Sequence, residues 1–210
     1  MQKLYAGIAV AALVGLVAGP LVYRQLSSPG DPFVACRQGA VGGGTIGGAF
    51  TLVNGAGQTV TDAQVITKPS LVYFGYTFCP DVCPFDAARN AQAVDLLEAQ
   101  GLDAQPVFIS VDPARDTPQV MKDYAANLHP KMVGLTGSAE QVKAASLAYK
   151  TYFKAQPAED EFYLVDHSTF TYLVLPQIGF VEFFKRETTP EQMAETTACY
   201  MEAAKSLPKN

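Results

Sequence analysis

The apolar run from Ser70 to Tyr76 constrains the fold more than any other segment of the chain. It reads SLVYFGY, a near-continuous hydrophobic strand of the kind that is buried on both faces of a central sheet. Helix-forming residues follow from Pro84 to Gln100, with Pro84 at the expected first helical position and Gly101 just past the expected end. A buried strand that leads directly into a long helix predicts a mixed α/β sheet.

Strands and helices alternate along the rest of the chain. Residues 49–53 and 58–65 flank a glycine-rich turn at 54–57, which predicts an N-terminal β-hairpin. Further strands are expected at 106–111, 161–165, 171–175 and 180–184, and further helices at 117–128, 138–150 and 190–206. This order is typical of a thioredoxin-like α/β sheet with an insertion, and we expect it to form one domain over residues 48–206.

An uncharged apolar stretch occupies residues 4–23. Its length of about 20 residues matches a helix that crosses a hydrocarbon core of about 30 Å. Lys3 before it and Arg24 after it weakly favour a cytoplasmic N-terminus and a translocated domain. A cleaved signal peptide and a buried helix are the alternatives, but the stretch is long for the first and has no polar face for the second. We expect a transmembrane anchor over 1–24 and a flexible tether, rich in Gly, Pro and Ser, over 25–47.

The charge pattern bears on the class of partner. Fifteen basic and twenty acidic residues give a formal net charge of -5, without a cluster of Lys or Arg. A protein that binds nucleic acid needs such a cluster to neutralise a row of phosphates. We therefore do not expect a nucleic-acid partner.

Cys79 and Cys83 lie between the predicted strand and the predicted helix, in the sequence TFCPDVCP. If Pro84 is the first helical residue, Cys83 is the N-cap, and the positive end of the helix dipole favours thiolates there. Three intervening residues allow either a disulfide, which could be purely structural, or a shared soft metal ion. A thioredoxin-type redox motif has two intervening residues, so the spacing makes a metal site more competitive.

His167 follows a predicted strand, far along the chain from the cysteines. In a thioredoxin-like sheet, the loop after a later strand can approach the loop before the first helix. Two sulfurs and one imidazole suit copper, as Cu(I) or Cu(II), and Asp166 is expected to orient the ring. A lone histidine is more often a surface or hydrogen-bonded residue, so the residues alone leave both interpretations open. His129, at a helix end, is expected to have a capping or solvent role.

Three motifs together resemble the Sco/SenC/PrrC family: YFGYTFCPDVCP at 73–84, ISVDPARDTP at 109–118 and VDHS at 165–168. The resemblance spans residues 48 to about 204. It implies a thioredoxin fold tethered by one N-terminal helix, with copper bound by Cys79, Cys83 and His167. It also implies a role in assembling the dinuclear copper centre of cytochrome c oxidase, with the copper-receiving oxidase subunit, and another copper carrier, as partners. The expected location is an inner membrane, with the domain in the periplasm or the mitochondrial intermembrane space.

Four further residues lie outside the metal motif. Cys36 in the tether and Cys199 in the closing helix would form a second bridge in an oxidising compartment, and two free thiols are an equal alternative. Asp112 and Arg115 follow the strand predicted at 106–111. We expect them to fix a loop by an ion pair rather than to act in catalysis.

Two functions compete for the Cys79–Cys83 pair. A copper metallochaperone would hold the ion and pass it to a partner by ligand exchange. A thiol-disulfide oxidoreductase or redox sensor would instead cycle the pair between dithiol and disulfide. His167 distinguishes the two functions, because only the three-ligand copper site requires it. A peroxiredoxin-like peroxidase is disfavoured, because Thr77 stands two residues before Cys79 rather than three.

Overall fold

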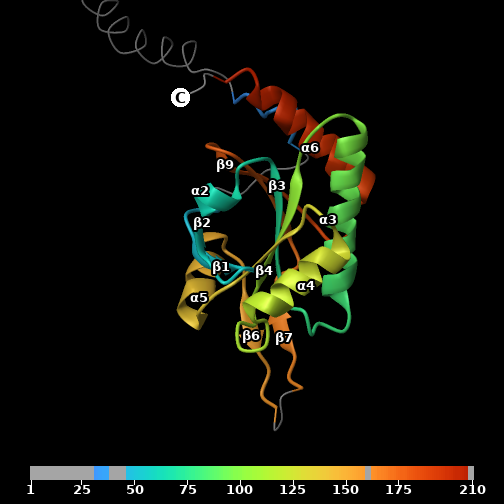
Figure 1. Cartoon of the computed structure of the whole chain (residues 1–210). Helices are drawn as coiled ribbons and strands as arrows, with labels where there is room; N and C mark the ends of the chain where they lie inside the picture. Colours follow the sequence, from blue (N-terminus) through green and yellow to red (C-terminus); the bar gives the residue numbers. More distant parts are fainter. Residues whose placement is uncertain (1–30, 38–45, 159–161, 208–210) are drawn as a thin grey trace, which may run out of the picture. The chain divides into compact units, whose positions relative to one another are not determined.

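The computed structural model describes residues 31–37, 46–158 and 162–207 (Figure 1). The strands are β1 (Thr51–Asn54), β2 (Thr59–Thr61), β3 (Ser70–Gly75), β4 (Gln105–Ser110), β5 (Val133–Thr136), β6 (Phe153–Ala155), β7 (Val165–His167), β8 (Thr171–Leu175) and β9 (Gly179–Phe184). The helices are α2 (Asp62–Val65), α3 (Val82–Ala99), α4 (Pro118–Leu128), α5 (Ala139–Ala148) and α6 (Pro190–Ala204). All of them belong to a compact unit over 36–210.

The anchor expected over 1–24 lies outside the described residues, as does most of the expected tether. In the part of the chain that is described, no helix combines the length and the apolar character that a membrane crossing requires.

Seven strands form the main sheet, in the order β2-β1-β5-β4-β3-β8-β9. The central strand β3 is parallel to β4 and antiparallel to β8, with Tyr73 opposite Phe108 on one side and Thr171 on the other. Every residue of β3, β4 and β8 is buried, as the continuous apolar runs predict. The mixed α/β thioredoxin-like fold and its N-terminal hairpin, in which β1 pairs antiparallel with β2, are therefore confirmed.

Helices cover this sheet in a way that the connections dictate. The crossovers from β3 to β4 and from β4 to β5 join parallel strands and carry α3 and α4. Helix α3 packs along α6 and also contacts α4, whereas α5 contacts β1 (Figure 1). Capping boxes begin three of the described helices, with Thr61 and Gln64 at α2, Ser138 and Gln141 at α5, and Thr189 and Gln192 at α6.

Some short elements differ from the sequence prediction. Residues 62–65, expected to extend the second hairpin strand, form α2, because Thr61 and Gln64 make a capping box. The strand predicted at 161–165 is instead β7, Val165–His167, which pairs with β6. Strands β5 and β6 were not expected, since each is only three or four residues long and gains its hydrogen bonds from a distant partner.

A disulfide joins Cys36 to Cys199, with 5.6 Å between the two Cα atoms. The bridge was one of two alternatives left open by the sequence, and the structure selects it. It attaches the segment that enters the domain to α6.

Candidate metal centre

The loop after β3 delivers both motif cysteines. Helix α3 begins at Val82 with Asp81 as its N-cap, two residues earlier than expected. Cys83 therefore lies inside the first turn and is not the N-cap. Pro84, the third residue of the helix, is tolerated there. The first four N–H groups of a helix have no partner within the helix, so the N–H that proline lacks breaks no helical hydrogen bond.

The two cysteines are buried and close together, and neither is in a disulfide. The Cys83 backbone N–H donates to Cys79 Sγ over 3.4 Å, so one of the free donors at the helix start points at this sulfur. Burial raises the pKa of the Cys83 thiol well above its ordinary value. This direction is opposite to the expectation that the helix start favours a Cys83 thiolate, because burial is the largest influence on the pKa of this thiol.

His167 ends β7, where it lies opposite Phe153 of β6. Its Nε2 atom lies 3.2 Å from Cys83 Sγ, and its Nδ1 atom lies 2.9 Å from the backbone oxygen of Ser168. A carbonyl oxygen only accepts, so the hydrogen is assigned to Nδ1, which leaves the Nε2 lone pair directed at the sulfur. Burial lowers the pKa of His167 and keeps the imidazole neutral, the form that binds metals.

The ligand atoms of Cys79, Cys83 and His167 all lie within 4.8 Å of one another. Bonds of about 2.0–2.3 Å from nitrogen and sulfur to a first-row metal ion separate two ligand atoms by about 4 Å. The three groups therefore fit one ion after changes of less than about 1 Å in the separations of the ligand atoms. The structure brings together all three residues that the sequence singled out.

Aromatic rings form the wall behind this cluster. The rings of Tyr73 and Tyr76 stand edge-on to the His167 imidazole, with centroids 6.1 and 5.7 Å away. The Tyr76 hydroxyl accepts a hydrogen bond of 3.2 Å from the Val165 backbone N–H. This bond connects the strand that leads to the cysteines with the strand that carries the histidine.

A buried charge pair below the cluster was missed by sequence reasoning. Asp86 and Arg89 lie 3.3 Å apart in α3, and Asp86 accepts a 3.0 Å hydrogen bond from the Tyr73 hydroxyl. The i, i+3 spacing of opposite charges is visible in the sequence, but it is equally common on solvated helix faces. Only burial distinguishes this pair.

Asp166 and His129 differ in part from the roles that the sequence predicts for them. Asp166 does not hydrogen-bond the His167 ring, because it accepts from the Gln156 amide over 2.8 Å, and the Ser168 carbonyl fixes the ring instead. His129 is the C-cap of α4, as expected, but it is buried and its ring lies 3.1 Å from Asp95.

The loop after β4 contains the expected ion pair, with Arg115 Nε 2.5 Å from Asp112 Oδ2. Its neighbour Asp116 accepts from the backbone N–H and the hydroxyl of Thr77 over 3.0 and 2.5 Å. Thr77 is thus held to this loop by hydrogen bonds, and Arg115 is held by its ion pair with Asp112.

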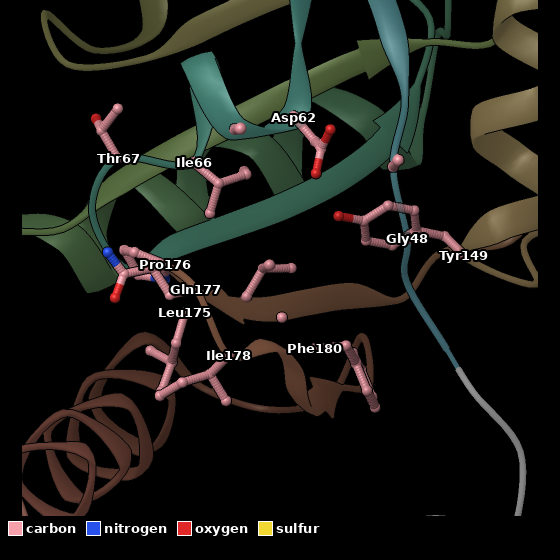
Figure 2. Close-up of a pocket in the computed structure, with 14 residues that line it drawn as sticks. Gly48, Asp62, Ile66, Thr67, Tyr149, Leu175, Pro176, Gln177, Ile178 and Phe180 are labelled. Atoms are coloured by element: carbon pink, nitrogen blue, oxygen red, sulfur yellow. The ribbon is translucent and has the colours of Figure 1, made fainter. Parts of the chain in front are cut away.

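A cavity of about 640 Å³ lies elsewhere (Figure 2). Its lining includes Asp62 of α2, Tyr149 and Phe180, with the β8–β9 turn around Gln177 (Figure 2). Leu175, the last residue of β8, also lines the cavity. It lies one residue beyond Val174, which pairs with Ser70 at the start of β3. The cavity is therefore at the opposite end of β3 from the cysteine loop and contains none of the three clustered residues.

A thioredoxin-like sheet with two free cysteines and a neutral imidazole at the start of a helix defines a thiol- or metal-binding protein of the thioredoxin class. The SCO1/SenC family profile matches residues 39–202, and the chain belongs to this family. Protein SenC of Rhodobacter capsulatus is 50% identical over 203 residues, which cover 96% of this chain and 92% of SenC.

Solved structures agree with this assignment. Arabidopsis thaliana ScoI with copper bound is 40% identical and matches with a TM-score of 0.71, over 75% of this chain and 99% of that structure. BsSco, a Sco-family cytochrome c oxidase assembly protein in which a disulfide switch has been identified, is 26% identical, with a TM-score of 0.59 over 76% of this chain and 94% of BsSco.

Proposed function

We propose that this protein is a copper metallochaperone that supports assembly of the dinuclear copper centre of cytochrome c oxidase. The observation that carries the proposal is the convergence of Cys79 Sγ, Cys83 Sγ and His167 Nε2 within 4.8 Å. Two thiolates and an imidazole are soft to intermediate ligands that favour copper, and Arabidopsis ScoI, which shares the fold, holds copper. The ion is cargo, and its receiver is a copper-binding subunit of the oxidase.

Binding and release both follow from the chemistry of the site. Burial raises the pKa of the Cys83 thiol, and a thiol must lose its proton to become a ligand, so copper binding at Cys83 releases a proton. Three protein ligands leave the ion open to an incoming thiolate or imidazole. Because His167 is only partly buried, a partner can approach the ion from that side.

The cellular setting is part of the same proposal. Residues 1–24 would anchor the chain in an inner membrane, and the tether would place the copper-binding domain of 48–206 in the periplasm or the mitochondrial intermembrane space. The Cys36–Cys199 disulfide supports a location outside the cytoplasm, since such bonds persist in oxidising compartments.

Metal analysis of the full chain, purified in detergent and loaded with Cu(I) under reducing conditions, tests the copper site. We expect one copper per chain and at least about 100-fold weaker binding after Cys79→Ala, Cys83→Ala or His167→Ala, since loss of an outer-shell partner alone costs about 10–100-fold. His129→Ala is the matched control, because that buried imidazole lies outside the cluster. Unchanged affinity in His167→Ala would refute the ligand assignment.

A second function is favoured by the closeness of the two free thiols. Cys79 and Cys83 can close a disulfide by a small movement, releasing two electrons and two protons to an oxidised partner. His167→Ala should leave the reduction potential of this pair within about 30 mV of the wild-type value, measured in glutathione buffers. A much larger shift would mean that the imidazole also serves thiol exchange.

A further inference from the structure

Arg115 lies in a cage of three aromatic rings beside the copper site. Its guanidinium carbon is 3.7 Å from the ring centroid of Tyr163, 4.8 Å from that of Phe78 and 5.7 Å from that of Tyr76. Only 12% of the Arg115 side chain is exposed, so these cation–π contacts are largely shielded from water. Asp112 fixes the cation from the side of its own loop.

The cage connects three segments that are distant in sequence. Phe78 directly precedes Cys79, Arg115 belongs to the loop after β4, and Tyr163 lies two residues before β7. The Tyr163 hydroxyl also donates to Asp112 Oδ1 over 2.6 Å, which closes a ring of contacts with the Arg115 ion pair. The loop that bears the sulfurs and the segment that leads to the imidazole therefore meet at one guanidinium.

Apart from the burial of Val165 and the hydrogen bond from its backbone N–H to the Tyr76 hydroxyl, strand β7 is held mainly by its short partner strand. It has three residues and pairs only with β6, which is equally short, in a sheet separate from the main one (Figure 1). An isolated two-stranded sheet is marginally stable. Phe162 and Leu164, on either side of Tyr163, are 75% and 45% exposed.

We propose that Arg115 is a positioning residue that holds Tyr163, and through β7 the His167 imidazole, within reach of the two sulfurs. The consequence for copper rests on the proposed function, whereas the effect on β7 does not. When β7 opens, the histidine is withdrawn, and apparent copper affinity falls with the fraction of molecules that remain closed. Arg115 acts through His167 and is not itself a ligand.

A double-mutant cycle on the full chain tests this coupling. Cu(I) affinity is measured by competition with a chromophoric chelator for wild type, Arg115→Met, His167→Ala and the double variant. We expect Arg115→Met to weaken binding on the order of 10-fold in the wild-type background, and to have no further effect when His167 is already absent. An equal loss in both backgrounds, or no loss in either, would overturn the proposal.

Hydrogen exchange of the metal-free protein tests the same proposal without copper. Arg115→Met should accelerate exchange of the β6 and β7 amides about 10-fold and leave β3 and β4 unchanged, because only local opening is affected. Tyr163→Leu should reproduce this result, whereas Tyr163→Phe, which keeps the ring, should have a smaller effect. Arg186→Met is the control, since Arg186 is exposed in the loop after β9.

The outcomes separate the two proposals. Wild-type protein that binds no copper would refute the proposed function, and the exchange data would still decide the role of Arg115. Unchanged exchange in β7, or uniform acceleration throughout the sheet, would refute the positioning role whatever the copper affinity.

Discussion

Gly75 shows how a single side chain shapes the site. A Cβ atom at this last residue of β3 would lie 2.9 Å from Cys83 Sγ and 2.7 and 2.9 Å from ring carbons of Tyr73 and Phe108. These separations are shorter than van der Waals contact, and the surrounding rings are fully buried. The glycine is therefore required by close packing of the Cys83 sulfur against the strand.

Gly75→Ala is expected to lower the free energy of unfolding by about 1–3 kcal/mol, the usual cost of overpacking a core. It should also weaken copper binding, because the added methyl displaces the Cys83 sulfur. Urea unfolding and Cu(I) competition measure the two effects. Gly48→Ala is the control, since its Cβ would make an ordinary 3.5 Å contact. Wild-type stability and affinity in Gly75→Ala would contradict this account.

At the scale of elements, Arg89 attaches α3 to the loop after β9. Its guanidinium donates to the backbone oxygens of Lys185 and Arg186, and over 3.2 Å to the Thr171 hydroxyl. Burial raises the pKa of Asp86, and the cation of Arg89 opposes that rise. The helix that carries Cys83 is thus held against β8 and β9 by one buried cation.

Arg89→Met is expected to destabilise the protein by about 3–5 kcal/mol, because it removes the only cation paired with the buried Asp86 carboxyl among the described residues and leaves it only the Tyr73 hydroxyl. Combining it with Asp86→Leu should recover most of that loss. The partly exposed pair of Lys68 and Asp103, 2.5 Å apart, is the matched control, and Lys68→Met should cost under about 1 kcal/mol. Chemical denaturation measures these three variants against the wild type, and similar costs for Arg89→Met and Lys68→Met would be inconsistent with this role.

At the scale of the whole molecule, the Cys36–Cys199 disulfide closes a loop across 163 positions. A cross-link of this span restricts the unfolded chain strongly. The double variant Cys36→Ser with Cys199→Ser should lower the free energy of unfolding by about 2–5 kcal/mol and still bind one copper per chain. Urea unfolding, with reduced wild type as the control, measures the first effect. Loss of copper binding would show that the disulfide supports the metal site directly.

Local sequence signals predicted the elements whose stability is local. The buried run at 70–75, the turn at 54–57 and the helix starts near residues 117 and 138 all appear where expected. In each case the residues that determine the conformation are neighbours in the chain. Strand β5 escaped prediction, because Gly134 lies in its middle and its hydrogen bonds come from β1 and β4.

By itself, the sequence determined the thioredoxin-like order of elements, because apolar periodicity is a property of the chain, and the resemblance of its motifs to the Sco/SenC/PrrC family implied the three clustered residues. Tertiary structure alone decided that His167 Nε2 lies 3.2 Å from Cys83 Sγ, that Ser168 and not Asp166 orients the ring, and that burial raises the pKa of the Cys83 thiol. Distance, dielectric environment and hydrogen-bond partner depend on which distant segments pack together, and the contacts of Arg115 with Tyr163 and Phe78 arise only from that packing.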